Sequence, residues 1–218
     1  FQLYETLYFL RTTLRAGLSY SMLRLSPRQN LYPTWGFRVG VTGRAVLFPT
    51  RLWGNIYELQ ATGYMPGFVP THGVRLSLYT VLQKRERVVQ VLSLPSRGLW
   101  FDAPDALRRG TQLFKADVDY VLPLLYPDLN LFSTLYLKRI STDFFFSYRL
   151  HETRYSEVSR TRVVGVEVLH DFHLLRAQYP WQWGYTLSFS PFGDPLGPQS
   201  RAKWSIQATL NVNFGAKE

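Results

Sequence analysis

The chain has 218 residues, of which 46% are apolar, 16% aromatic and 18% charged, and it contains no cysteine. This composition fits a single folded domain over residues 1–218, and it excludes a disordered chain, a disulfide scaffold and a thiolate metal site. The formal net charge of +10 suits nucleic acid, anionic lipid or charges on an inward face, so the charge alone selects none of them.

Strands with two unlike faces are predicted along most of the chain, because apolar and polar residues alternate with a period of two. In the last such segment the even positions 202–214 are apolar and the odd positions 201–213 are polar. About ten strands are expected, most of them long enough to cross a bilayer at a tilt. In chain order they lie near 3–14, 18–26, 34–48, 55–66, 73–84, 111–123, 130–148, 158–175, 181–190 and 201–214. The predicted fold class is all-β, an antiparallel transmembrane β-barrel, complete or part of a larger barrel.

The connections between these strands alternate in length. A tight turn is expected at residues 15–17, and Pro- or Asn-containing turns are expected at 26–33, 65–72, 124–129 and 176–180. Long loops are expected at 85–110, 149–157 and 191–200. Outer-membrane barrels have short periplasmic turns and long external loops, so the alternation predicts an outer-membrane location. An even number of strands would place both termini in the periplasm.

A soluble antiparallel barrel or sandwich also alternates, with its apolar face inward, and periodicity does not say which face is inside. Strand length and mid-strand charges on the polar face favour the membrane. Aromatic residues near the expected strand ends favour it as well, namely Trp35, Trp53, Tyr64, Trp181, Trp183, Trp204 and Phe214.

Two acidic pairs raise the question of catalysis. Asp117 with Asp119, and Asp171 with His173, each share one strand face, which resembles the pairs that activate water in omptin proteases. Nothing else in the chain resembles an omptin, so a barrel hydrolase is the third hypothesis and no catalytic residue is predicted. His170 and His173 fall on opposite strand faces, so we expect neither a metal site nor a cofactor.

The arginines are spread over strand faces and loops, whereas nucleic-acid-binding proteins cluster basic residues with aromatic ones. Binding of nucleic acid is therefore not expected. Inward arginines and lysines can pair with acids in the lumen, and arginines near loops, such as Arg108, Arg109, Arg154 and Arg160, suit the phosphates of lipopolysaccharide. Outer-membrane lipid and lipopolysaccharide are the predicted partners, with other outer-membrane or periplasmic proteins as further candidates.

Several segments in order resemble the barrel of the BamA-type (bacterial surface antigen) superfamily, and most of all its divergent members from Bacteroidota. The segments with this resemblance are 32–36 (YPTWG), 64–67 (YMPG), 72–76 (HGVRL), 96–99 (SRGL), 119–124 (DYVLPL) and 164–167 (VGVE). The resemblance implies the membrane-embedded, C-terminal part of a protein assembly or translocation factor. A full sixteen-stranded barrel would need about 350 residues, so the chain is expected to be a portion of one or a smaller relative.

The resemblance also implies a loop that folds into the lumen through Arg97 and Gly98. In the family this arginine meets an acid in a Phe-x-Asp-x-Gly strand, but the aligned residues 145–149 (FFSYR) lack both Asp and Gly. The replacement acids expected here are Asp117, Asp119, Asp143 or Glu167, and the alternation of faces favours Asp117, Asp119 and Glu167 over Asp143. Phe214 resembles the C-terminal aromatic residue that targets outer-membrane proteins, although four residues follow it. The alternative to a translocation factor is a passive anchor or narrow pore for a missing periplasmic domain.

Overall fold

The computed structural model describes residues 12–24, 32–48, 54–83, 110–131, 134–153, 158–174, 181–191 and 203–212. These residues form one antiparallel sheet of ten strands, and they contain no helix long and apolar enough to cross a membrane. The strands are β1 (Thr12–Leu23), β2 (Gly36–Phe48), β3 (Ile56–Pro66), β4 (Gly73–Gln83), β5 (Gly110–Leu125), β6 (Leu129–Leu131), β7 (Leu135–Thr153), β8 (Val158–Leu174), β9 (Trp181–Ser190) and β10 (Lys203–Val212).

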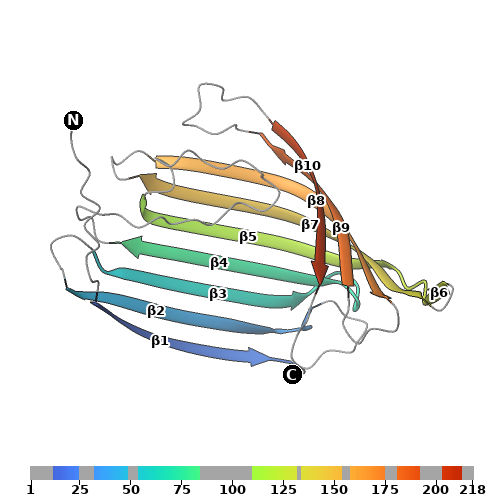
Figure 1. The fold of residues 1–218 in the computed structure, drawn as a ribbon, viewed down its shortest axis with the longest axis horizontal. Helices are drawn as coiled ribbons and strands as arrows, with labels where there is room; N and C mark the ends of the chain where they lie inside the picture. The colour runs from blue at the N-terminus through green and yellow to red at the C-terminus, as the bar shows by residue number, and fades with distance from the viewer. Residues whose placement is uncertain are drawn as a thin grey trace.

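The sheet follows chain order, β1-β2-β3-β4-β5-β7-β8-β9-β10, and the short strand β6 pairs only with β7. The sheet is strongly curved, and Figure 1 shows β9 and β10 running across the direction of β1–β5. Within the described residues β1 and β10 do not pair with each other, so the sheet is not closed. The prediction of an all-β, antiparallel, barrel-like fold is confirmed.

The predicted division of the N-terminal region is wrong. Residues expected to form two strands, 3–14 and 18–26, with a turn at 15–17, instead contribute one strand, β1, that pairs without interruption with β2 from Thr13 to Leu23. Gly17 lies opposite Thr42 inside this ladder. Gly17 has no side chain, so it interrupts the alternation of apolar and polar residues although the strand continues through it. This interruption is the reason for the predicted turn.

The strand predicted at 130–148 is displaced toward the C-terminus. Leu129–Leu131 is a separate short strand that folds back onto the beginning of β7. The strand β7 then continues to Thr153, so the long loop expected to begin at residue 149 is mostly strand.

The predicted turn at 65–72 lies within the described residues, and so does Gly36, where β2 begins after the predicted turn at 26–33. Gly36 begins β2 with φ +151°, and a Cβ there would lie 2.4 Å from the carbonyl oxygen of Met22, so only glycine fits. The turn between β3 and β4 is closed by two backbone hydrogen bonds, from Gly67 to His72 and from His72 to Val69. His72 Nδ1 also lies 2.6 Å from the hydroxyl oxygen of Tyr120, which ties this turn to β5.

The connections define two ends of the sheet. We call the end with the connections after β2, β4, β7 and β9 the loop end, and the end with the connections after β1, β3, β5 and β8 the turn end. Nine long strands form the sheet path, so β1 begins at the loop end and β10 finishes at the turn end. The described strands therefore do not supply the even number that would place both termini on one side.

Candidate functional site on the inner face

The two faces of the sheet differ in polarity along all nine long strands. One row of directly paired residues crosses the whole sheet on the face that we call the outer face. Its members are Met22, Phe37, Gly63, Leu76, Val118, Phe146, Val164, Phe189 and Trp204. The neighbouring row, on the inner face, contains Tyr64, Arg75, Asp119, Phe145, Gly165, Ser188 and Ser205. The strands are therefore sorted into an apolar and a polar surface.

The apolar face is the exposed one. Leu18 on β1 is 80% exposed and Ile206 on β10 is 81% exposed, whereas Asp119 is fully buried and Ser147 is 1% exposed on the inner face. A soluble barrel or sandwich would show the opposite pattern, with apolar side chains buried and polar ones in solvent. The inner face also holds buried apolar residues, among them the packed cluster of Ile56, Val81 and Leu113, but most of the large exposed hydrophobic side chains lie on the outer face.

Aromatic side chains gather on the outer face near both ends of β8–β10. Toward the turn end, Phe172 packs on Trp181, and Trp183 packs on Tyr185 with ring centroids 4.9 Å apart. His170 lies beside these last two rings, at 6.2 and 6.1 Å. Toward the loop end, a second group is formed by Phe189 and Trp204, whose centroids are 4.6 Å apart.

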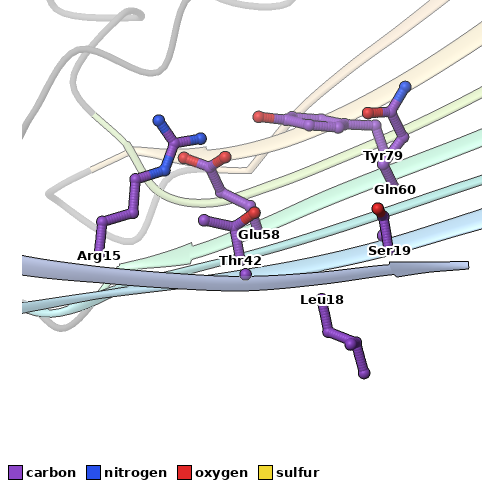
Figure 2. A pocket seen from close by; sticks show the side chains of 9 residues that line it. Arg15, Leu18, Ser19, Thr42, Glu58, Gln60 and Tyr79 are labelled. Atoms are coloured by element: carbon purple, nitrogen blue, oxygen red, sulfur yellow. The ribbon is translucent and has the colours of Figure 1, made fainter.

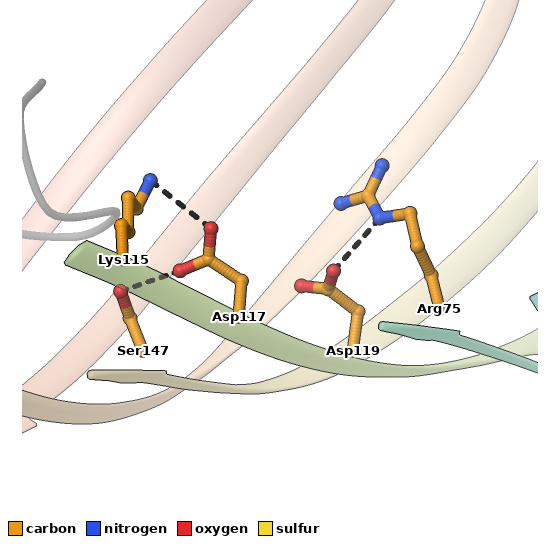
Figure 3. Close-up of polar contacts among 5 residues, drawn as sticks. All are labelled: Arg75, Lys115, Asp117, Asp119 and Ser147. Carbon is orange, nitrogen blue, oxygen red and sulfur yellow. Dashed lines mark hydrogen bonds and ion pairs between the residues drawn. The ribbon is translucent and has the colours of Figure 1, made fainter. Parts of the chain in front are cut away.

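The inner face carries the four described acids that the sequence singled out. Asp119 Oδ2 accepts a hydrogen bond from Arg75 Nε at 2.8 Å across the β4–β5 pair (Figure 3). The guanidinium of Arg75 also lies over the ring of Tyr32, 4.8 Å from its centroid. The buried carboxylate is thus neutralised by a cation that an aromatic ring holds in place.

Asp117 lies two residues before Asp119 on the same face. Its Oδ2 is 3.1 Å from Lys115 Nζ, and its Oδ1 accepts a hydrogen bond from Ser147 Oγ at 2.6 Å (Figure 3). Ser147 stands where the BamA-type resemblance implies an aspartate. A carboxylate is therefore present at this place on the inner face, but Asp117 of the neighbouring strand supplies it.

Asp143 and Glu167 lie directly opposite each other on β7 and β8, on the inner face. This answers the open question about Asp143, which is 2% exposed and shares the face of the other three acids. With Asp117 and Asp119 on β5, these side chains form an acidic band across three adjacent strands. Arg75 and Lys115 already pair with two of these four acids, so the band and its cations form a network of charges on the inner face.

Next to this band on the inner face, two large apolar side chains each lie over a glycine of the neighbouring strand. The ring of Phe145 covers Gly165, where an added Cβ would lie 2.4 Å from Phe145 Cζ. Leu169 covers Gly184 in the same way, at 2.5 Å from its Cδ2. In each case a glycine on one strand receives the large side chain of the strand beside it, which fixes the spacing of the inner-face groups.

The second acidic pair of the sequence does not form a dyad in the structure. Asp171 Oδ2 accepts hydrogen bonds from Arg139 Nε and Nη2 at 2.8 and 2.5 Å, and Asp171 Oδ1 accepts one from Gln182 at 2.9 Å. Both oxygens of Asp171 therefore have partners other than His173, which packs against the ring of Tyr136. The described residues also contain no group of three or more His, Asp or Glu side chains that could hold a metal ion.

A groove of about 360 Å³ on the inner face was not predicted. It is lined by residues of β1–β4, and Figure 2 shows Arg15, Thr42 and Glu58 on one side of β1 with Leu18 on the opposite side. Gly17 and Gly40, on adjacent strands, leave the space open. Two inner-face glycines within one strand pair are the signal that could have indicated it.

At the turn end, β5 leads into β6 through Asp128, whose φ of +48° is tolerated by aspartate. The hydroxyl of Tyr136 donates a hydrogen bond to Asp128. The predicted loop residues Arg97 and Gly98 and the predicted targeting residue Phe214 lie outside the described residues.

Comparison of the chain with protein families, with curated proteins and with solved structures finds no match.

Proposed function

We propose that this chain is an outer-membrane β-barrel domain, the membrane-embedded part of a BamA-like protein assembly or translocation factor. The observation that carries the proposal is the inverted distribution of polarity, with exposed apolar residues outside and partly buried ion pairs inside. A contiguous exposed apolar surface of this extent marks a membrane or a protein interface. The apolar surface here continues around every strand, which suits lipid better than a patch for one partner.

The lengths and connections support the same proposal. The long strands have between 10 and 19 residues, and a tilted strand needs about 9–11 to cross the hydrocarbon region. The connection of β4 to β5 leaves the loop end and is the longest in the described path, whereas β3 and β4 are joined at the turn end by a compact turn. We place the turn end in the periplasm and the loop end outside, following the pattern of bacterial barrels.

The more specific role in assembly or translocation rests on the resemblance of the six segments and on the acidic band. We propose that Arg97 reaches the band from the long connection between β4 and β5, as the resemblance implies. A guanidinium that leaves water needs an acidic partner, because an unpaired buried charge is costly. Asp117, beside Ser147, stands at the place where the family has its acid, so it is the first candidate and Asp119 the second.

Spin labels test the membrane assignment. Labels at residues 206 and 210 are expected to be accessible to oxygen dissolved in lipid, and labels at 205 and 207 to a polar relaxation agent in water. The four positions lie on one strand, so each inward label is the control for its outward neighbour. The opposite pattern would refute the barrel and would favour a soluble protein.

A separate experiment tests the lid. Arg97→Ala is expected to make residues 88–99 sensitive to external protease in intact cells, while Arg97→Lys retains a cation and should protect them in part. Asp117→Asn should reproduce the Arg97→Ala result, and Asp143→Asn should do so less. Equal protease resistance in all four variants would remove the lid and leave a passive anchor or pore as the better proposal.

A further inference from the structure

Two arginines interrupt the apolar outer face, both on β8 near the loop end. The outward residues of β8 run from Val158 through Arg160 and Arg162 to Val164, Val166 and Val168. Arg160 lies opposite Leu150, and Arg162 lies opposite Tyr148. Both arginines are exposed, so they stand on the surface that we assign to lipid.

The position of these arginines along the strand is that of a membrane boundary. Val164 belongs to the outer-face row that ends in Phe189 and Trp204, and Arg162 lies one two-residue step beyond it, or about 7 Å along the strand. Tryptophan and tyrosine side chains gather where hydrocarbon meets the lipid headgroups. Arg162 and Arg160 therefore stand at headgroup depth, where a charged side chain is tolerated.

The surroundings of the two guanidinium groups favour an anion. The Arg162 guanidinium lies 6.0 Å from the centroid of Tyr148, whose ring also contacts Phe114. The outward acid on β7 at this end, Glu152, lies opposite Val158, one two-residue step from Leu150, which is opposite Arg160. Among the described outward residues of β7 and β8 at this end, two guanidinium groups accompany one carboxylate, a balance that favours an anion.

The backbone at the site is held in place. Ser190 Oγ donates a hydrogen bond to the carbonyl oxygen of Arg162 at 3.0 Å, from the last residue of β9. Two arginines at i and i+2 on one strand face stand about 7 Å apart, so their guanidinium forks can address one phosphate or two neighbouring ones. The apolar residues below them offer a surface for acyl chains.

We infer that Arg160 and Arg162 form a binding site for the phosphate groups of a membrane lipid of the outer leaflet, a phosphorylated glycolipid of the lipid A class. Guanidinium recognises phosphate through paired N–H donors, and its long apolar stem packs along the barrel while the charge stays at the headgroups. The inference rests on the proposed membrane embedding, because a lipid can reach this face only if the sheet stands in a bilayer. It goes beyond that proposal, and beyond the contact expected from the sequence at Arg160, by adding Arg162 and the paired geometry of the two guanidinium groups on β8.

The experiment uses the whole chain, reconstituted first in neutral phosphatidylcholine vesicles and then in vesicles that also contain a few per cent of lipid A. Binding is measured as lipid A retained on the protein by native mass spectrometry after extraction. The double variant Arg160→Gln/Arg162→Gln is compared with wild type, and Arg38→Gln, on the inner face of β2, is a control with a change of the same chemical type. We expect wild type and Arg38→Gln to retain lipid A. The double variant is expected to retain at most about one tenth of the wild-type amount.

The possible outcomes distinguish a failure of the lipid site from a failure of the membrane assignment. Equal retention by the double variant and wild type, with both inserted in neutral vesicles, would overturn the lipid site and leave the membrane assignment intact. Competition by millimolar inorganic phosphate as effective as that by lipid A would show a site for free phosphate, which also overturns the inference. If wild type does not insert into neutral vesicles at all, the proposed function fails, and this site fails with it.

Discussion

Arginine in place of Ala208 is the sharpest test of how the sheet is oriented. Ala208 lies on the outer face of β10, opposite Tyr185 and between Ile206 and Leu210, which are 81% and 59% exposed. If the outer face contacts lipid, the variant Ala208→Arg places a guanidinium in hydrocarbon. If the outer face contacts water or another polar surface, the same change adds an ordinary surface charge.

The expected cost follows from the depth of residue 208. Along β10, residue 212 lies eight residue steps after Trp204, or about 26 Å along the strand. At a tilt of about 40° this is roughly 20 Å across the membrane, so Ala208 lies near the middle. Arginine on the lipid face costs about 2–4 kcal/mol at the midplane, and only about 0–1 kcal/mol near the interfaces.

The assay is the free energy of unfolding from phosphatidylcholine vesicles, obtained by denaturant titration with linear extrapolation. Gln207→Arg is the matched control, because Gln207 is the next residue on the strand and faces inward beside Thr186. We expect Ala208→Arg to lose about 2–4 kcal/mol and Gln207→Arg to lose under 1 kcal/mol. Equal losses, or a larger loss at Gln207, would refute the assignment of the outer face to lipid.

Two further changes test the inner face. Gly165→Ala is expected to lower the free energy of unfolding by about 1–3 kcal/mol, because the added methyl group overlaps the Phe145 ring. The control Gly63→Ala should change it little, because nothing lies within 4 Å of the Cβ position of Gly63. A neutral Gly165→Ala in the same titration would contradict the packing described. Asp119→Asn is expected to lower stability by about 1–3 kcal/mol, because it weakens a buried charged hydrogen bond. Purified protein is expected to cleave no peptide, and Asp119→Asn and His173→Ala to leave this unchanged; cleavage lost in both variants would instead favour the omptin-like hydrolase.

The period-two pattern predicted most of the sheet. From Gly36 onward the alternation gives most of the strands, apart from the one predicted at 130–148, which is Leu135–Thr153 in the structure. It also sorts the residues correctly into two faces, because a strand side chain can point only to one face or the other. Where the pattern is broken by a small residue, the prediction fails. Gly17 suggested a turn, yet its neighbours Ala16 and Leu18 keep their register against β2.

The sequence did not indicate which face is buried, because the same alternation serves a soluble barrel turned the other way. That information depends on curvature, which is a property of all the strands together. The inner-face groove is hidden for the same reason, since Gly17 and Gly40 become neighbours only through the pairing of β1 with β2. The acids were predicted individually, and the sheet register shows that all four share the inner face.

The position of Asp117 bears on the proposed lid, because its carboxylate lies against the residue at which the resemblance implies an acid. Position 147 holds serine where the resemblance implies an acid, and its hydroxyl donates to Asp117 Oδ1 at 2.6 Å. In an antiparallel sheet a residue and its directly paired partner have Cβ atoms only about 4.5–5.5 Å apart, so a carboxylate can move from one strand to the next with little change in its location. Lys115, 3.1 Å from the same carboxylate, adds a cation that an incoming Arg97 must share or displace. In the proposed lid, a carboxylate shared with Lys115 would hold Arg97 less tightly than an acid with no cation beside it.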